Sequence, residues 1–460
     1  MGYTIQAAGC WVMAFLLAID VRAQGPADTL VGLKGLVESA AQRYHAIRAG
    51  KLEVDAARQG VEVAKYSRMP ALDVSYQAGI GTANNLTGIF YPGEVLPMTG
   101  PPSVANKYSP ATGSAASLLL NWQAMTFGAR NAQIDVSVAE AGAKRASWET
   151  MLFDYKIRVI SVYLDVLLAA DVMTVQRGNV ERGEAVLRES RFLSRTGVRP
   201  GVDTALLASE LSKSRVGYLQ AQRQLKVAQL TLGQLIGAEG LPVAVDTAFM
   251  EQLPKDAGAA DTAVSGIPFM REGESQVFLS QSRERALRKS FLPKLNVWAT
   301  GFARGSGFEP DGTLKTWDGL GLSRYNYGAG VSLVFPILKY GEVRRQVQMQ
   351  SFLSGAAREQ LEERRSELTT RQRIAGVTFD NSIAVAAETD VSLGSGRYAY
   401  NAMRIRYNTG LATYADMIQA QYGLLKAELD RKQAYWEAWK ALLFEAAVHG
   451  DENLFLQAIR

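Results

Sequence analysis

The alternation of apolar and polar residues predicts four β-strands, arranged in two pairs. Residues 71–81 and 327–335 alternate most regularly, and residues 114–122 and 294–304 show the same pattern less cleanly. Alternation with a period of two is typical of a strand with one apolar face. Each segment has about the length that a tilted strand needs to cross a bilayer. A soluble antiparallel sheet with one wet face would give the same pattern, so this alternative stays open.

The same types of residue flank and separate the strands in both pairs. Pro70 precedes the first pair and Pro293 precedes the second. Within each pair the strands are separated by a long stretch rich in Gly, Pro and Asn, at 81–113 and 305–326. Such residues favour turns and loops, so these stretches fit the exposed end of a hairpin.

A long helical pattern follows each strand pair. Residues 129–193 and 342–406 contain no proline, and at about 1.5 Å per residue each helix would be roughly 100 Å long. Both patterns stop at Thr-Gly, and return helices are expected at 203–236 and 413–448. The return helices carry a heptad seam of mostly small residues, which is typical of coiled-coil packing. The seam consists of Leu207, Ser214, Ala221, Ala228 and Leu235, and of Ala420, Ala427, Ala434 and Ala441.

The spacing of these features shows that the chain contains two copies of one unit. Phe127 lies 69 residues before Thr196, and Tyr340 lies 69 residues before Thr409. An ungapped repeat over such a distance indicates packed helices, because loops tolerate insertions and helices in contact do not. We therefore divide the chain into repeat 1 at 24–236, a connecting segment at 237–271, repeat 2 at 272–450 and a tail at 451–460.

The N-terminal residues 1–23 are expected to be a signal peptide, because an apolar run is followed by small residues around Arg22. The only cysteine is Cys10, and the only histidines are His45 and His449. This inventory excludes a Cys/His metal site and a thiol nucleophile, and we expect no cofactor. Beyond the N-terminus no run of 18 or more residues is continuously apolar, so no transmembrane helix is expected. The net charge of +5 is spread along the chain, which argues against nucleic acid as a partner.

Four strands cannot close a barrel, and open sheet edges are not tolerated in lipid. If the strands cross a membrane, several chains must contribute strands to one barrel. The expected fold class is therefore an α+β membrane protein with two repeats, each made of two strands and long coiled-coil helices, in a cyclic oligomer.

The order of elements resembles the TolC family of outer-membrane efflux channels. The residues that carry the resemblance are Met69-Pro70-Ala71-Leu72 and Leu292-Pro293-Lys294-Leu295 at the strand starts, Phe127-Gly128 and Tyr340-Gly341 at the helix starts, and the two Thr-Gly turns followed by Asp. The resemblance covers almost the whole chain beyond the signal peptide.

This resemblance implies a homotrimer with a twelve-stranded barrel in outer-membrane lipid, continued by an α-helical barrel in the periplasm. The family acts as an exit duct for efflux or type I secretion, and its partners are a periplasmic adaptor protein and an inner-membrane pump. No enzymatic activity is expected.

The resemblance also implies two sets of functional residues at the helical turns. Those expected to dock the adaptor are Thr196, Gly197, Val198, Thr409, Gly410, Leu411 and Thr413. Those expected to hold the periplasmic gate are Asp203, Tyr407, Asp416 and Arg199. In the family a Tyr at the position of Tyr407 bonds an Asp at the position of Asp203, and an Asp at the position of Asp416 belongs to an acidic ring that faces the pore.

Plainer interpretations stay open for each set. Gly197 could simply stop a helix, and an Asp near a helix start could cap it. At the level of the whole chain, a coiled-coil protein that spaces envelope layers without transport activity would share the signal peptide and the long helices. It would not explain the paired alternating strands.

Overall fold

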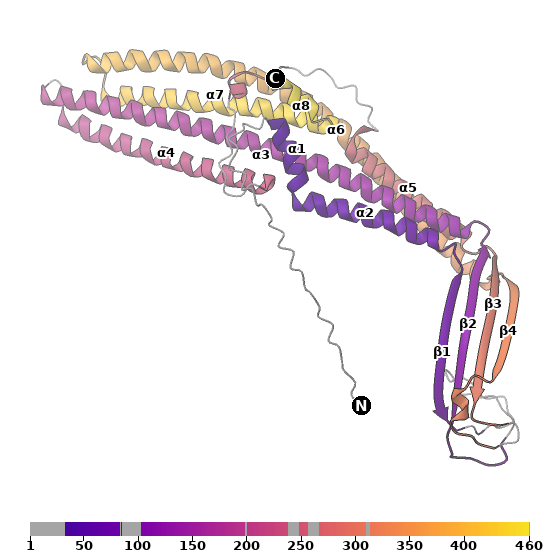
Figure 1. Cartoon of the computed structure of the whole chain (residues 1–460). Helices are drawn as coiled ribbons and strands as arrows, with labels where there is room; N and C mark the ends of the chain where they lie inside the picture. The colour runs from indigo at the N-terminus through magenta and orange to yellow at the C-terminus, as the bar shows by residue number, and fades with distance from the viewer. Residues whose placement is uncertain are drawn as a thin grey trace, which may run out of the picture.

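The computed structural model describes residues 33–82, 84, 103–197, 200–237, 248–255, 266–309 and 313–459. One four-stranded sheet lies at one end of a long array of helices, and the helical turns lie at the other end (Figure 1). The helices are α1 (Leu33–Arg43), α2 (His45–Tyr66), α3 (Ala129–Arg195), α4 (Gly201–Ile236), α5 (Pro268–Lys289), α6 (Tyr340–Asn408), α7 (Tyr414–His449) and α8 (Asn453–Ala458). Short 3-10 turns are η1 (Ala248–Glu251), η3 (Asp318–Leu320) and η4 (Ile337–Lys339).

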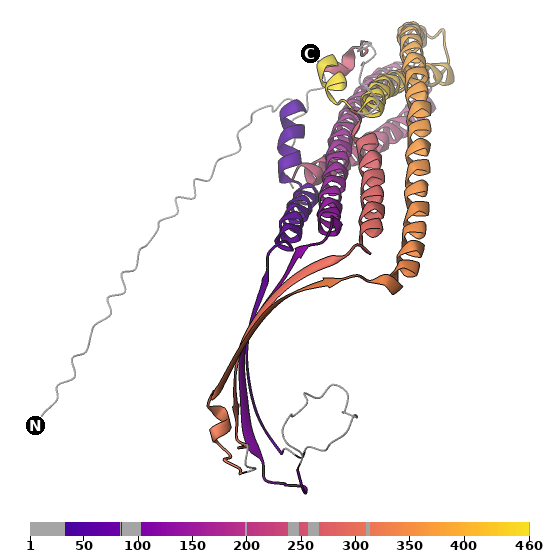
Figure 2. The ribbon, with the colours of Figure 1, turned by 90° about the vertical axis from the view of Figure 1, so that its right-hand side faces the viewer.

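The two strand pairs join into a single antiparallel sheet in the order β1-β2-β3-β4. Its strands are β1 (Ala71–Gly81), β2 (Ala111–Met125), β3 (Lys294–Ser306) and β4 (Arg324–Val334). They run side by side as a twisted ribbon (Figure 2). The ends of β2, β3 and β4 differ by one to three residues from the ranges expected from alternation. The ladder of β2 and β3 continues past the point where alternation weakens, with a register shift between Gln123 and Met125.

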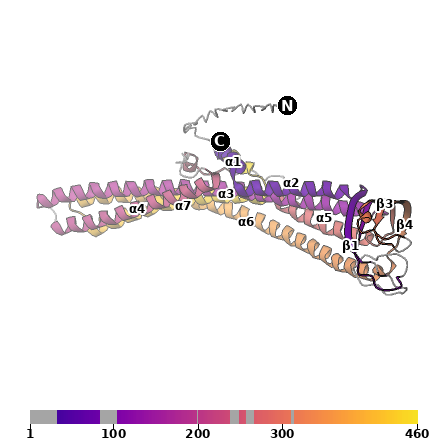
Figure 3. The same cartoon turned by 60° about the horizontal axis from the view of Figure 1, so that its bottom comes forward.

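The helical part consists of two antiparallel pairs, α3 with α4 and α6 with α7, which lie alongside each other (Figure 3). Adding 213 to the bounds of α4 gives those of α7, and adding 213 to Arg195, where α3 ends, gives Asn408, where α6 ends. The repeat seen in the sequence therefore extends to the helix ends. The helices α3 and α6 have 67 and 69 residues, and each is about 100 Å long.

The heptad seam faces the partner helix within each pair. Leu207, Ala221 and Leu235 are buried in α4, and Ala427, Ala434 and Ala441 are buried in α7. Small side chains at these positions let α3 approach α4 and α6 approach α7 closely.

The largest apolar core lies midway along the helices. It gathers residues from α1, α3, α4, α7 and α8 around the fully buried Phe455 and the buried Trp439. The expected tail at 451–460 thus contributes a helix to this core. The expected connecting segment ran to residue 271, but α5 already starts at Pro268. A proline at the first helical position favours a helix start there, because its backbone φ is already close to the helical value.

Candidate functional site

One face of the sheet is a continuous apolar band. Residues directly opposite in an antiparallel ladder share a face, so the register defines its rows. The rows, from the helices outward, are Trp122, Val297 and Val331; Leu72, Leu120, Ala299 and Ala329; Val74, Leu118, Gly301 and Tyr327; and Tyr76, Ala116, Ala303 and Tyr325. Aromatic residues border the band at both ends, which is typical of a lipid-facing barrel wall.

The opposite face of the sheet is mostly polar. It carries Asp73, Ser75, Gln77, Ser117, Asn121, Asn296, Thr300, Arg304, Asn326 and Ser332, together with the apolar Leu119 and Phe302. The hydroxyls of Ser75 and Ser117 are hydrogen-bonded at 2.8 Å across the β1–β2 ladder. Trp298 also lies on this face and covers Gly330, where a Cβ atom would come within 2.6 Å of the indole. A sheet with one apolar and one polar face fits a wall between lipid and water.

At the far end of the helices, both expected docking turns have the same backbone geometry. Gly197 and Gly410 have φ values of 74° and 83°, the left-handed conformation that ends many helices. The hydroxyls of Thr196 and Thr409 donate to carbonyls of the preceding turn. Among the described residues, nothing lies within 4 Å of where a Cβ atom would stand at either glycine, so packing inside the described chain does not require glycine there. Each glycine ends its helix, and the space beside it stays open to a partner.

Several apolar side chains are exposed around these turns. Leu411 is 71% exposed, and Phe192, Val202 and Ile405 are each more than 60% exposed. Of the residues expected at the docking and gate sites, Val198 and Arg199 lie outside the residues that the structure describes.

The two acidic residues of the expected gate occupy equivalent positions but make different bonds. Asp203 is the third residue of α4 and Asp416 is the third residue of α7. Asp416 forms a capping box: its backbone N–H donates to the Thr413 hydroxyl at 3.2 Å, and its carboxylate accepts from the Thr413 N–H at 2.9 Å. In α4 the capping position is Pro200, which has no N–H and no hydroxyl, so Asp203 cannot make the same box.

The carboxylate of Asp203 instead faces α6. The Tyr407 hydroxyl donates to its Oδ2 at 3.5 Å, and Tyr407 is fully buried in the apolar core of the tip. The structure therefore brings together two of the expected gate residues, from opposite repeats. It places Asp416 in an exposed capping box, where the carboxylate also has access to solvent.

Two further contacts between the repeats were not predicted from the sequence. The Asn408 amide donates to the Glu189 carboxylate at 3.0 Å, and the Tyr422 hydroxyl donates to the Glu210 carboxylate. No sequence motif could predict either pair, because each joins helices that are far apart in the sequence. The capping box, in contrast, could have been predicted from the sequence, since Thr413 and Asp416 have the spacing that such boxes require.

Hydrogen bonds at the tip favour ionised carboxylates. Those from the Thr413 side chain and backbone lower the pKa of Asp416. Burial opposes ionisation of Glu210, but hydrogen bonds from Lys213 and Tyr422 outweigh it and lower its pKa. The same bond to Glu210, reinforced by burial, raises the pKa of Tyr422 to about 12. Both carboxylates are therefore ionised at neutral pH.

Residues 36–238 and 261–443 match the family model described as outer membrane efflux protein. The chain belongs to this family. The match spans both repeats, including the sheet and both helical turns. No curated protein matches the chain.

Solved outer-membrane channels share the fold of this efflux protein. OprN is 18% identical with a TM-score of 0.73, covering 92% of this chain and 90% of its own. The CmeC channel of Campylobacter jejuni is 15% identical with a TM-score of 0.73, covering 91% of this chain and 85% of its own. The open state of the MtrE channel of Neisseria gonorrhoeae is 16% identical with a TM-score of 0.71, covering 91% of this chain and 89% of its own. These relatives are channels rather than enzymes.

Among the described residues, one helix, α3, contains an 18-residue window that is long and apolar enough to cross a membrane, judged by length and composition alone. The expectation of no such helix rested on an uninterrupted apolar run, which is a stricter criterion. In the structure 39% of this window is buried, and buried residues of α3 such as Leu164 and Leu167 belong to the main helical core.

Proposed function

We propose that three copies of this efflux protein form one exit duct across the outer membrane and the periplasm. The two faces of the sheet are the observation that carries this proposal. An apolar face needs lipid, a polar face needs water, and four strands alone cannot separate the two.

The open edges of the sheet support assembly. Within the described chain β1 pairs only with β2, and β4 pairs only with β3. Unpaired backbone groups in lipid cost several kcal/mol each, so β4 of one copy must pair with β1 of another. Three copies give twelve strands, enough to close a barrel, whereas a single chain gives too few.

In this proposal the helices continue the barrel into the periplasm, and the turns at Gly197 and Gly410 dock a periplasmic adaptor that links the duct to an inner-membrane pump. The exposed Leu411 and the open space beside each glycine offer a surface for a partner backbone and apolar side chains. The duct itself does no chemistry. A spacer protein without transport activity would have no need for the two-faced sheet.

Conductance in planar lipid bilayers tests the duct. The purified assembly is expected to form discrete channels and to migrate as a trimer before heating and as a monomer after it. A stable assembly that never conducts, under any voltage or after tip substitutions, would contradict the proposal and favour a spacer.

Docking needs a separate test. Gly410→Ala puts a Cβ on a backbone with φ of 83°, which strains the turn by about 1 kcal/mol. Complementation of transport in cells should fall for Gly410→Ala and for Leu411→Asp, with trimer formation intact. Gly60→Ala, in the open middle of α2, is the matched control and should leave efflux unchanged.

A further inference from the structure

The polar face of the sheet carries an excess of positive charge. The four strands contain three cations, Lys294, Arg304 and Arg324, and one carboxylate, Asp73. The register places all four residues on the polar face, so each copy adds a net charge of +2 there, three cations less one carboxylate. Asp73 lies two rows nearer the helices than the two arginines, about 13 Å along the strands. That separation exceeds the screening length in physiological salt, so Asp73 does not neutralise the arginines.

The two arginines lie directly opposite each other on neighbouring strands. Arg304 of β3 is paired with Arg324 of β4, and the row continues through Ala115 and Gln77. Such partners have Cβ atoms about 4.5–5.5 Å apart, and like charges in this position are destabilising. Both side chains are exposed, and neither forms an ion pair within the described part of the chain. A repulsive pair of this kind calls for a negative partner from outside the chain.

The described carboxylates at the same end of the sheet are engaged elsewhere. Glu309 forms an ion pair with Lys315 at 3.2 Å. Asp318 belongs to the short turn η3, whose place is fixed by a hydrogen bond of 2.8 Å from the Ser114 hydroxyl to the Gly319 carbonyl. Ser114 continues the apolar face of β2, so η3 covers the apolar side of the sheet. The arginines point to the other side.

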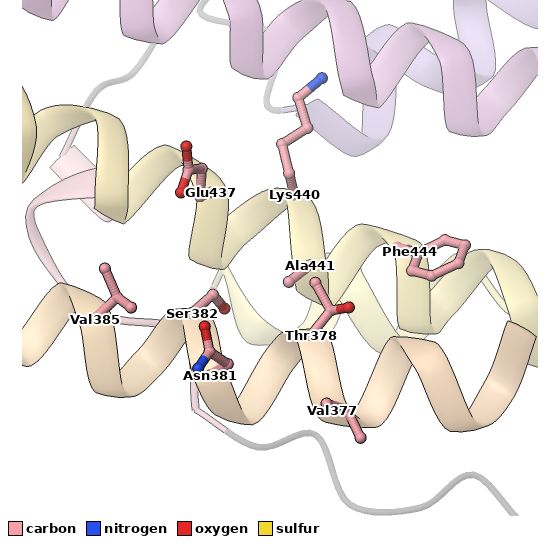
Figure 4. Close-up of a pocket in the computed structure, with 9 residues that line it drawn as sticks. All are labelled: Val377, Thr378, Asn381, Ser382, Val385, Glu437, Lys440, Ala441 and Phe444. Carbon is pink, nitrogen blue, oxygen red and sulfur yellow. The ribbon is translucent and has the colours of Figure 1, made fainter.

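The cations along the helices differ, because carboxylates of the same chain neutralise them. The groove between α6 and α7 in Figure 4 has one cation, Lys440, and one carboxylate, Glu437, among its lining residues. The ammonium group of Lys440 extends toward α3, where it lies 2.9 Å from Asp165. Arg182 of α3 is likewise paired with Glu428 of α7 at 2.7 Å. Neither cation is available to an anion in the way that the arginine row is.

We propose that Arg304 and Arg324 form an anion-binding ring in the outer mouth of the duct, with two arginines from each of three copies. The proposal rests on the duct proposed above and names the chemistry that its mouth favours, which is a phosphate, sulfate or carboxylate group on the departing solute. Guanidinium groups bind such anions through paired N–H donors. An anion held between the two arginines replaces their repulsion by two attractions. Rings of arginine or lysine select anions in other pores.

The surroundings of the arginine row leave room for such a ligand. The next row outward on the polar face consists of Gly79, Gly113 and Ser306, and the next row inward contains Ser117 and Asn326. These residues are uncharged, and those of the outer row are small. The guanidinium groups can therefore reach into the lumen, where the apolar wall of the barrel focuses their field on the water-filled space.

Block of the channel current by inorganic tripolyphosphate tests the ring. In phosphatidylcholine bilayers, which carry no net charge, tripolyphosphate should block the native channel at a lower concentration from the sheet side than from the tip side. Arg304→Gln with Arg324→Gln should raise the half-blocking concentration on the sheet side by about tenfold. Each single substitution should raise it by less, which gives the same test in a milder variant. Block should weaken from about 0.1 M to about 1 M salt, because the Debye length falls to about 3 Å.

Arg48→Gln with Lys51→Gln is the matched control. It also removes two exposed cations, but from the end of α2 that is remote from the sheet, so block should stay as in the native channel. Conducting channels whose block is unchanged by the arginine substitutions, or weakened equally by the control, would overturn the ring and leave the duct standing. A native channel that tripolyphosphate does not block from the sheet side would do the same. A protein that forms no channels would overturn both proposals.

Discussion

The Tyr407 hydroxyl donates a hydrogen bond to the Asp203 carboxylate at 3.5 Å, joining α6 of the second repeat to the first turn of α4 in the first. The distance is long for an O–H···O bond, so the link is a weak one. Its partners differ in burial, since Tyr407 is fully buried and Asp203 lies at the edge of the tip. Such a contact can hold the helical turns together at rest and still break when they separate.

Breaking this link should open the duct. We predict that Tyr407→Phe with Asp203→Ala raises the single-channel conductance, because each copy loses about 0.5–1.5 kcal/mol that favours the closed tip. Tyr398→Phe, at an exposed position of the same helix, is the matched control and should conduct like the native protein. If the double variant keeps the native conductance, this pair does not hold the gate.

The capping box of α7 should make the stability of the first turn of α7 depend on pH. The pKa of Asp416 is lowered by the Thr413 hydrogen bonds, so its stabilisation is complete above the ordinary pKa of an Asp. It is lost as the pH falls through the lowered value. Hydrogen-exchange protection of the first turn of α7 should therefore decrease in acid, and Asp416→Asn should remove that decrease. Asp203→Asn should not change protection at the start of α7, because the capping box of α7 consists of Thr413 and Asp416 and does not include Asp203. Equal effects of the two substitutions would contradict this assignment.

Lys432 and Asp171 form an ion pair that holds α7 to α3, with their side chains 14% and 12% exposed. Burial raises the pKa of Asp171 and outweighs the nearby ammonium group of Lys432, which lowers it. The attraction between the two charges therefore does not fully offset the free energy that Asp171 loses when it leaves water. Lys432→Leu alone should destabilise the protein by about 3–5 kcal/mol, because Asp171 would be buried without a partner.

The other repeat supplies the control for this pair. Its equivalent positions are Leu219 and Ala384, so the double variant Lys432→Leu with Asp171→Ala gives the α3–α7 contact the residue types of the other repeat. Thermal dissociation of the trimer should recover to near the native temperature in the double variant. A double variant that is less stable than the single one would show that the pair stabilises the fold in its own right.

The strands and long helices could be predicted from the sequence because their signals are periodic and occur twice. Alternation located β1 at its observed bounds, and the Thr-Gly turns located the ends of α3 and α6 within two residues. Contacts between helices carry no such signal. Glu189 with Asn408, and Glu210 with Tyr422, depend on how two helix pairs face each other, which no spacing along the chain encodes. The helix caps at Pro200 and Thr413 are an intermediate case. Aligning the two repeats shows from the sequence alone that one cap residue has a hydroxyl and the other does not.

The two faces of β1 provide the most direct test of the sheet as a membrane wall. Val74 lies in a middle row of the apolar band, whereas Ser75 next to it points to the polar face. An arginine on the lipid face near the bilayer centre costs about 2–4 kcal/mol, and each copy would carry one. We predict that Val74→Arg prevents the appearance of heat-sensitive trimers in outer-membrane fractions.

Ser75→Arg is the matched control for this substitution. It adds the same side chain one residue away, where water and the polar face can accept it, and removes only the hydrogen bond to Ser117. Trimers should form, and their channels should become less selective for cations because three new positive charges line the pore. Equal tolerance of both arginines would mean that neither face contacts lipid, and the sheet would then be a soluble one with two wet faces.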